Sequence, residues 1–129
     1  MAMVGILLVS HSETMARGLS ELLAQIGSEH VSIRAAGGTS NGDLGTSADA
    51  VEAALRDLAA ADGIVVIPDL GSAVLTVKTV MSELDLDDVV LVDAPFVEGA
   101  VAAAVTAASG ASLEVVAQAA REARDVPKF

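Results

Sequence analysis

The sequence has no cysteine, no tryptophan and no tyrosine, and only two of its 129 residues, Phe96 and Phe129, are aromatic. The lack of cysteine excludes disulfides, thiolate metal sites and cysteine catalysis. Basic residues are also scarce, since 7 lysines and arginines face 18 acidic residues and leave a net charge of −11. A chain this acidic is repelled by nucleic acids and by anionic membrane surfaces. We therefore expect a protein that binds neither, and the lack of cysteine fits a cytoplasmic location.

Long apolar runs are also absent: none approaches the ~20 residues that a membrane-spanning helix needs. The apolar residues that are present are small: 53% of the chain is hydrophobic, and much of that is alanine and valine. Small side chains suit the close packing of helices on a sheet. The length is that of one domain. We therefore expect residues 1–129 to form a single domain.

Short apolar segments alternate along the chain with segments of helical periodicity. Apolar strands that alternate with helices in this way predict a parallel sheet covered on both faces. The predicted fold class is α/β, a three-layer open sheet, mainly parallel, with helices on both faces. The predicted strands span residues 4–10, 31–35, 64–68 and 89–92. The predicted helices span 13–26, a segment capped by Thr46 or Ser47, a segment that starts from 69–72, an alanine-rich segment to about 109, and 112 to about 124.

Residue types suited to chemistry gather in the four loops that follow the strands. Ligands of open α/β sheets bind at the carboxyl ends of the strands, where these loops meet. The opposite loops, such as GSEH and DLDDV, are plain connections. This one-sided distribution predicts a functional site at the carboxyl edge. The four loops contain His11–Ser12, Gly37–Thr46, Asp69–Ser72 and Pro95–Gly99.

His11 is the candidate nucleophile. It is predicted just past a strand and within the first turn of a helix, where the helix dipole favours an anion and disfavours a cationic imidazole. A neutral imidazole carries a nitrogen lone pair that can attack phosphorus. The resulting negative charge would lie over the helix N-terminus, with the hydroxyls of Ser10 and Ser12 beside it. The alternative is a histidine that only packs or caps, and position alone does not decide between them.

Asp69 is the predicted partner of His11. A neutral histidine nucleophile needs one ring nitrogen protonated and held, and a carboxylate is the usual holder. The first and third strands commonly lie side by side in such sheets, so Asp69 is within reach of His11. A hydrogen bond from Nδ1 would leave Nε2 as the nucleophile. The alternative is that Asp69 is a turn residue or a helix cap.

The loop from Gly37 to Thr46 contains four glycines and is suited to hold a phosphoryl group through backbone N–H groups. It matches neither the P-loop pattern nor GxGxxG, so no nucleotide site is predicted in this chain. A flexible surface loop is the alternative for residues 40–43. Together with His11 and Asp69, the predicted site residues are Ser10, Ser12, Gly37, Gly38, Thr39, Thr46, Gly71 and Ser72.

Three further polar residues have weaker assignments. His30 is predicted at the opposite end of the sheet from His11, so the two histidines cannot share a zinc ion, and no metal is expected. Lys78 lies one to two turns into its predicted helix and is expected to be solvated. Glu98 either shapes the site or caps a helix.

The segments that carry these residues resemble a known family, the phosphotransfer subunits (DhaM) of phosphoenolpyruvate-dependent dihydroxyacetone kinase. The core of these subunits is an EIIA domain of the mannose type from the sugar phosphotransferase system. The resemblance extends over about residues 3–120, and its more specific motifs are DLGSA and PFVEG. The matching segments are ILLVSHS, AAGGTS, GTSADAV, PDLGSAVLTVKTVMS and DAPFVEGAVAAAVTAASG.

The resemblance implies a function and partners. The histidine matching His11 takes a phosphoryl group from the carrier protein HPr and passes it to ADP held on the nucleotide-binding subunit of the kinase, and the ATP formed phosphorylates dihydroxyacetone on a third subunit. Asp69 would orient the imidazole, and this chain would bind no cofactor itself. The family also implies a homodimer and, in some members, an antiparallel edge strand. Some relatives carry fused HPr and enzyme I domains; here we expect separate partners.

Other functions stay open at this point. The EIIA component of a mannose-type sugar permease would use the same His11 chemistry but pass the phosphoryl group to a sugar-transport domain. A receiver-like signalling domain needs an acidic pair after the first strand, where this chain has Ser10-His11-Ser12. A scaffold without turnover is also compatible with the sequence. If HPr docks at the His11 face, that face should be less acidic than the chain as a whole.

Overall fold

A computed structural model describes residues 3–27 and 30–129. Four parallel strands form one open sheet in the order β2-β1-β3-β4. The strands are β1 (Gly5–Ser10), β2 (Ile33–Gly37), β3 (Ile64–Pro68) and β4 (Val89–Leu91). The helices are α1 (Glu13–Ile26), α2 (Ala48–Asp57), α3 (Gly71–Leu84), α4 (Phe96–Ala108) and α5 (Leu113–Glu122), followed by a short 3-10 helix, Ala123–Asp125.

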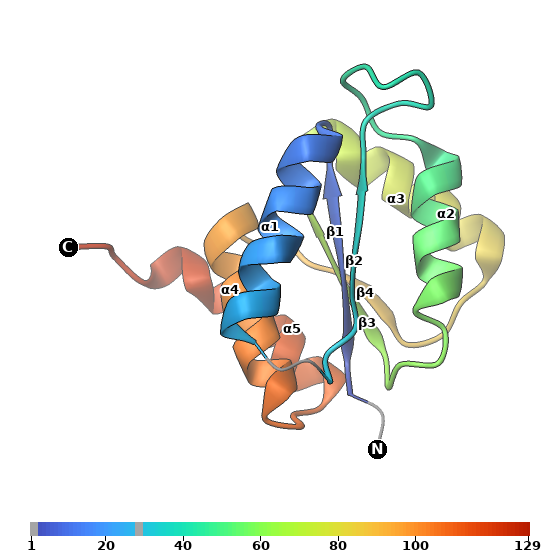
Figure 1. Ribbon diagram of the computed structural model, residues 1–129. Coiled ribbons are helices and arrows are strands. Elements are labelled where there is room, and N and C mark those ends of the chain that lie inside the picture. The colour runs from blue at the N-terminus through green and yellow to red at the C-terminus, as the bar shows by residue number, and fades with distance from the viewer. Residues whose placement is uncertain (1–2, 28–29) are drawn as a thin grey trace.

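Helices cover both faces of the sheet, with α1, α4 and α5 on one side and α2 and α3 on the other (Figure 1). The central strand β1 is buried along its whole length. Its side chains alternate between the two cores: Ile6 and Leu8 pack towards α1 and α4, whereas Leu7 and Val9 pack towards α2 and α3. This arrangement confirms the predicted α/β fold class. Every strand pair in the described part of the chain is parallel.

The bounds of the second strand and the placement of His11 differ from the predictions. The second strand was predicted over 31–35 but spans Ile33–Gly37. Its bounds follow from the backbone ladder with β1, which pairs Ile6 with Ile33 and Ser10 with Gly37, rather than from its apolar residues. His11 was predicted inside the first turn of a helix, but α1 begins at Glu13. Ser12 is extended there and caps the helix, so His11 lies just outside it.

Serine side chains cap three of the five helices. Ser12, Ser47 and Ser112 each accept a hydrogen bond from the backbone N–H three residues on, which starts α1, α2 and α5. Of the two predicted caps of α2, Ser47 rather than Thr46 has this role. The N-cap of α3 is Leu70, which provides no side-chain acceptor. Within the described residues, none of the helices combines the length and the hydropathy of a membrane span.

Candidate active site

The carboxyl ends of three neighbouring strands bring the predicted residues together. Ser10 is the last residue of β1, Asp69 directly follows β3, and Gly37 is the last residue of β2. Because β1 lies between β2 and β3, His11 has the glycine loop on one side and Asp69 on the other. The Asp69 N–H donates to the carbonyl of Val9 at 2.9 Å, which extends the sheet by one more bond. The fold thereby places Asp69 against His11.

The imidazole of His11 is held at both ring nitrogens. Its Nδ1 lies 3.0 Å from Oδ1 of Asp69. Since a carboxylate can only accept, Nδ1 carries the proton in this contact. The neutral ring then has its lone pair on Nε2, which accepts from the hydroxyl of Ser72. The His11 side chain is 23% exposed and that of Asp69 only 5%. The imidazole that carries the reactive nitrogen is thus partly accessible, whereas the Asp69 carboxylate that holds the imidazole is buried.

Asp69 is an anion held by four hydrogen bonds. Its Oδ2 accepts from the Ser10 hydroxyl at 2.9 Å and from the backbone N–H of His11 at 3.0 Å. Its Oδ1 accepts from His11 Nδ1 and, at 2.7 Å, from the N–H of Leu70. Burial alone would raise the pKa of Asp69, but the bonds from His11, Ser10 and Leu70 outweigh it and hold the pKa below its ordinary value. The carboxylate is therefore ionised at neutral pH.

The glycine loop packs against the backbone of the His11 segment. A Cβ atom at Gly37 would lie 2.6 Å from the carbonyl oxygen of Ser12. Gly38 has φ +75° and Gly45 has φ +146°, a backbone region that glycine adopts readily. The N–H of Gly45 donates to the carbonyl of His11 at 2.9 Å. The loop therefore positions the His11 backbone, and the N–H of Gly45 is engaged there.

The close approach at Gly37 leads to a stability prediction. Gly37→Ala should lower the free energy of unfolding by about 1–3 kcal/mol, because the new methyl group overlaps the backbone of Ser12 and Glu13. Gly18→Ala is the matched control: Gly18 is exposed within α1 and has no atom within 4 Å of an added Cβ. That change should raise stability by up to about 1 kcal/mol. Urea unfolding measures both, and equal effects would contradict the close packing.

The hydroxyls predicted at the site divide into distinct roles. Ser72 contacts the reactive ring nitrogen, Ser10 contacts Asp69, and Ser12 caps α1. The Thr39 hydroxyl accepts from Asp43 N–H at 3.2 Å and closes its own loop. The Thr46 hydroxyl is buried and has no hydrogen-bond partner within the part of the chain that the structure describes. Of the predicted hydroxyls, only that of Ser72 is hydrogen-bonded to the His11 ring, although sequence reasoning did not rank it above the others.

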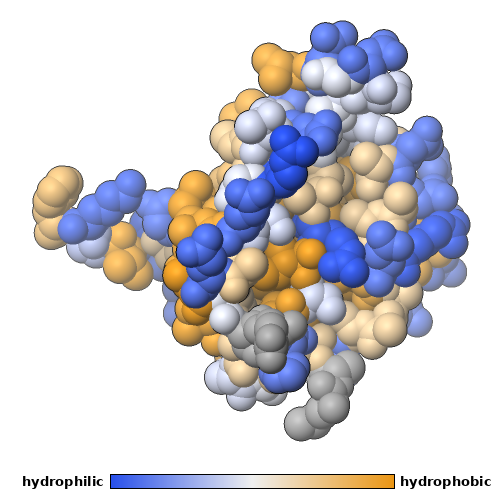
Figure 2. Space-filling model, in the orientation of Figure 1, coloured by the Kyte–Doolittle hydropathy of each residue, from blue (hydrophilic) through white to orange (hydrophobic). Residues whose placement is uncertain are grey.

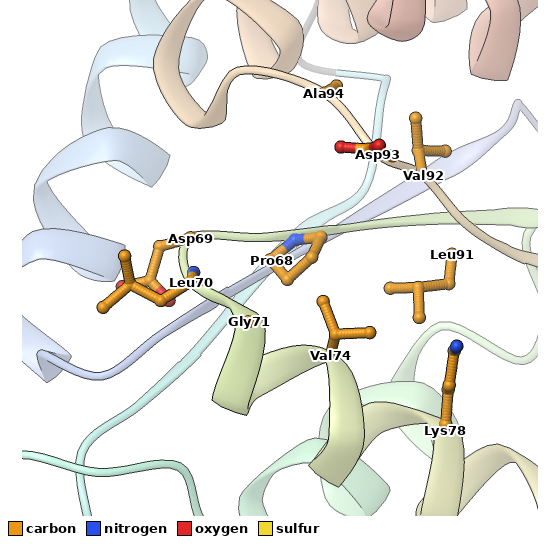
Figure 3. A pocket seen from close by; sticks show the side chains of 10 residues that line it. All are labelled: Pro68, Asp69, Leu70, Gly71, Val74, Lys78, Leu91, Val92, Asp93 and Ala94. Carbon is orange, nitrogen blue, oxygen red and sulfur yellow. The ribbon is translucent and has the colours of Figure 1, made fainter.

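A groove of about 490 Å³ extends away from Asp69 between α3 and β4 (Figure 3). Pro68, Val74 and Leu91 contribute apolar walls, and Lys78 lies at the far end of the view from Asp69. Sequence reasoning assigned Lys78 to solvent. The residue is exposed, yet it also lines this groove, and no sequence signal distinguishes the two situations.

Glu98 lies apart from the His11 contacts. It is in the first turn of α4, and its carboxylate is 3.3 Å from Nζ of Lys128. The backbone N–H of Glu98 and the Lys128 ammonium hold the pKa of Glu98 below its ordinary value. Glu98 therefore interacts with the C-terminal tail, which extends away from the body of the protein (Figures 1 and 2).

Known proteins resemble this chain along most of its length. A model of the EIIA-man family, described as the PTS system fructose IIA component, matches residues 5–117. The phosphoryl donor subunit DhaM of PEP-dependent dihydroxyacetone kinase 2 from Listeria innocua is 36% identical over 119 residues, which cover 90% of this chain and 95% of that protein. The corresponding subunit from Providencia stuartii is 36% identical over 94% of this chain but only 27% of that protein.

A solved structure also matches along the whole chain. It is the crystal structure of EF1359, a protein of unknown function, with a TM-score of 0.84 and 34% sequence identity. The alignment covers 100% of this chain and 98% of that chain. The arrangement of strands and helices described above is therefore found in an experimental structure of a related sequence.

Proposed function

Because this chain belongs to the EIIA-man family of phosphotransferase-system proteins, we propose that it carries a phosphoryl group on Nε2 of His11, from HPr to ADP on the nucleotide-binding subunit of dihydroxyacetone kinase. The chain is a phosphotransferase subunit, the phosphoryl donor of a PEP-dependent dihydroxyacetone kinase, as its relatives from Listeria innocua and Providencia stuartii are. The proposal adds to this function the residue that carries the phosphoryl group, its donor and its acceptor.

The observation that carries the proposal is the state of the His11 ring. Asp69 holds Nδ1 as a donor at 3.0 Å, so the lone pair of the neutral ring lies on Nε2. Nε2 is in contact with the hydroxyl of Ser72, the second residue of α3. A nucleophile next to an orienting carboxylate and a hydroxyl donor is suited to accept a phosphoryl group on nitrogen.

In the phosphoryl transfer, each N–P or O–P bond that forms is matched by an N–P bond that breaks, and no further acid or base is needed. The Nε2 lone pair attacks the phosphorus of the donor phosphohistidine, a new N–P bond forms, and the donor's N–P bond breaks with its electron pair returning to the donor nitrogen. In the second half, a terminal oxygen of ADP attacks the same phosphorus and the N–P bond of His11 breaks. While phosphorylated, the His11 ring has both nitrogens substituted and is cationic, and the Asp69 carboxylate stabilises it.

The start of α3 is suited to the phosphoryl anion. Leu70 leaves this helix without a side-chain cap. The N–H of Ala73 donates to the carbonyl of Leu70 at 3.0 Å, whereas the N–H groups of Gly71 and Ser72 have no acceptor recorded among the described residues. Free N–H groups and the helix dipole favour negative charge there. When phosphorus occupies Nε2, the Ser72 hydroxyl can turn from the ring nitrogen to a phosphoryl oxygen. Ser72 thus serves the resting ring and the phosphorylated ring in turn.

The charge distribution favours partner docking at the carboxyl edge. At that edge, Glu13 is paired with Arg17 at 3.3 Å and Asp93 with Arg124 at 3.1 Å. Exposed acidic side chains without a recorded ion pair lie at both edges: Asp43 and Asp49 at the His11 edge, and a larger group at the end of α2 and in the loops before β3 and β4, at the opposite edge. The larger group consists of Asp57, Asp62, Asp85, Asp87 and Asp88. A partner that carries phosphate therefore meets less repulsion at the His11 edge than at the opposite edge.

The phosphoryl transfer can be followed directly. Incubation with phosphoenolpyruvate, enzyme I and HPr should give the chain an acid-labile phosphate, because N–P bonds are cleaved by acid. Addition of the ADP-loaded nucleotide-binding subunit should then discharge the label and form ATP. The same subunit without ADP is the control and should leave the label in place.

The rival acceptor makes the opposite prediction. If the labelled chain failed to discharge to the ADP-loaded subunit but discharged to the next domain of a mannose-type sugar permease, the proposed acceptor would be wrong. If HPr gave no label at all, the proposed donor would be wrong. The homodimer and the single-domain organisation also stay predictions.

A further inference from the structure

We propose that Ser10 is a positioning residue, whose hydroxyl orients the Asp69 carboxylate and thereby selects the proton position on His11. This inference rests on the proposed function for its kinetic consequence, but its structural content is independent of it. Sequence reasoning had placed the Ser10 hydroxyl among the groups around the phosphoryl group. The contacts of Ser10 assign it to the carboxylate instead.

The burial of Ser10 is unusual for a serine. It is 0% exposed and is the only polar residue in the buried class within the described part of the chain. It follows four apolar residues of a fully buried strand, where an alanine would fit without a polar atom to satisfy. A hydroxyl buried in this way is unfavourable unless it is hydrogen-bonded. The bonds that satisfy it therefore indicate what the hydroxyl does.

The Ser10 hydroxyl has one donor bond and one acceptor bond. It donates to Oδ2 of Asp69 at 2.9 Å and accepts from the backbone N–H of Ser12 at 3.0 Å. A hydroxyl has a single hydrogen, and here that hydrogen is directed to the carboxylate. It is consequently not available to a phosphoryl oxygen on the other side of the imidazole. The N–H of Ser12 fixes the rotation of the hydroxyl and links it to the start of α1.

Ser10 and His11 have symmetrical places on the Asp69 carboxylate. Each carboxylate oxygen accepts one backbone N–H and one side-chain donor: His11 N–H and Ser10 on Oδ2, Leu70 N–H and His11 Nδ1 on Oδ1. The two backbone donors are fixed by the chain, and Ser10 supplies the remaining bond on Oδ2. Without it Oδ2 keeps only the backbone N–H of His11, the carboxylate is held less firmly, and the bond from Nδ1 that keeps the lone pair on Nε2 becomes weaker.

The direct readout is the position of the proton on the neutral His11 ring. Imidazole nitrogen NMR at about pH 9, well above the ordinary histidine pKa of ~6.5, distinguishes the Nδ1–H form from the Nε2–H form. In the unmodified chain, His11 should show the Nδ1–H form alone, with His30 as the internal reference. In Ser10→Ala, signals of both forms should be present for His11, and the His30 signals should not move.

The kinetic readout is phosphorylation by HPr. Ser10→Ala should slow it by about 10-fold, the scale on which loss of a residue supporting a functional histidine is felt. Ser112→Ala is the matched control, because it also deletes a serine hydroxyl that accepts a backbone N–H, but at the start of α5. It should lower the thermal midpoint and change neither the rate nor the His11 signals. Ser10→Thr retains the hydroxyl and should restore the Nδ1–H form.

The proposal would be overturned if folded Ser10→Ala retained the Nδ1–H form alone and the rate of the unmodified chain, which would make Ser10 a structural residue only. If Ser10→Ala does not fold, Ser10→Cys, with a thiol that is a weak donor, decides on the same two readouts. The NMR measurement needs no phosphoryl donor. A chain that HPr cannot phosphorylate would therefore contradict the proposed function while the role of Ser10 is judged on the NMR signals.

Discussion

His11→Ala should reduce phosphoryl incorporation from HPr to background while the chain remains folded. The imidazole provides the Nε2 lone pair that takes the phosphoryl group, and the neighbouring hydroxyl of Ser72 lacks a base once the ring is gone. Folding should survive, because the His11 side chain is partly exposed and the carboxylate of Asp69 keeps its bonds from Ser10, from the His11 backbone and from Leu70. Acid-labile label on the isolated chain is the measurement.

Two further variants make the result specific to the ring. His11→Gln retains a side chain that can hydrogen-bond to Asp69 but has no nucleophilic nitrogen, so it should also stay unlabelled. His30→Ala removes the only other histidine, which is exposed and lies before β2, and should be labelled like the unmodified chain. Persistent label on His11→Ala, or loss of label on His30→Ala, would show that the phosphoryl group is carried elsewhere.

The parts of the fold that follow from local patterns were predictable. The α1 helix was predicted over the residues where it is found, because its apolar residues recur at helical spacing. The bounds of β3 were also predicted, since it is a short apolar run between turn residues, and it is buried throughout. The juxtaposition of His11 and Asp69 followed from a general rule: neighbouring parallel strands bring their carboxyl ends to one edge of the sheet.

The parts that depend on pairing across the chain were not predictable. The bounds of β2 are fixed by the ladder with β1, and its exposed Arg34 gives no apolar signal for them. The partners of the three serine hydroxyls at the site depend on rotamers and on distances between β1 and α3. Sequence therefore grouped Ser10, Ser12 and Ser72 together, whereas the structure assigns them to a carboxylate, a helix cap and the imidazole.

Asp69→Asn should slow phosphorylation by HPr by about 10²- to 10⁴-fold. The upper end of this range is the effect that the same change has beside the catalytic histidine of serine proteases. Each oxygen of Asp69 accepts a backbone N–H, from His11 on Oδ2 and from Leu70 on Oδ1, so either orientation of the amide sets its NH₂ against a backbone donor. The orientation that keeps oxygen on the His11 N–H is favoured, because the Leu70 bond is exposed and water can replace it.

In that orientation the amide NH₂ of the variant faces Nδ1 of His11. The ring then accepts at Nδ1 and carries its proton on Nε2, so the nucleophilic lone pair is lost. Imidazole nitrogen NMR should show the Nε2–H form, the opposite of the unmodified chain. A slow variant that kept the Nδ1–H form would indicate that Asp69 acts through its charge alone, and an unchanged rate would remove Asp69 from the site.

The pH dependence of the free energy of unfolding tests the charge of Asp69 separately from its effect on the proton position of His11. The folded-state pKa of Asp69 lies below its unfolded value of 3.8, so the carboxylate stabilises the fold fully above that pH, and this stabilisation is lost as the pH falls through the folded-state pKa. Asp69→Asn should therefore be less stable than the unmodified chain at neutral pH, and the difference should shrink below about pH 4. Urea unfolding at a series of pH values measures this difference. A stability gap that is constant down to the lowest pH would mean that the hydrogen bonds of Asp69 do not depend on its negative charge, and the anionic carboxylate proposed to hold His11 would be contradicted.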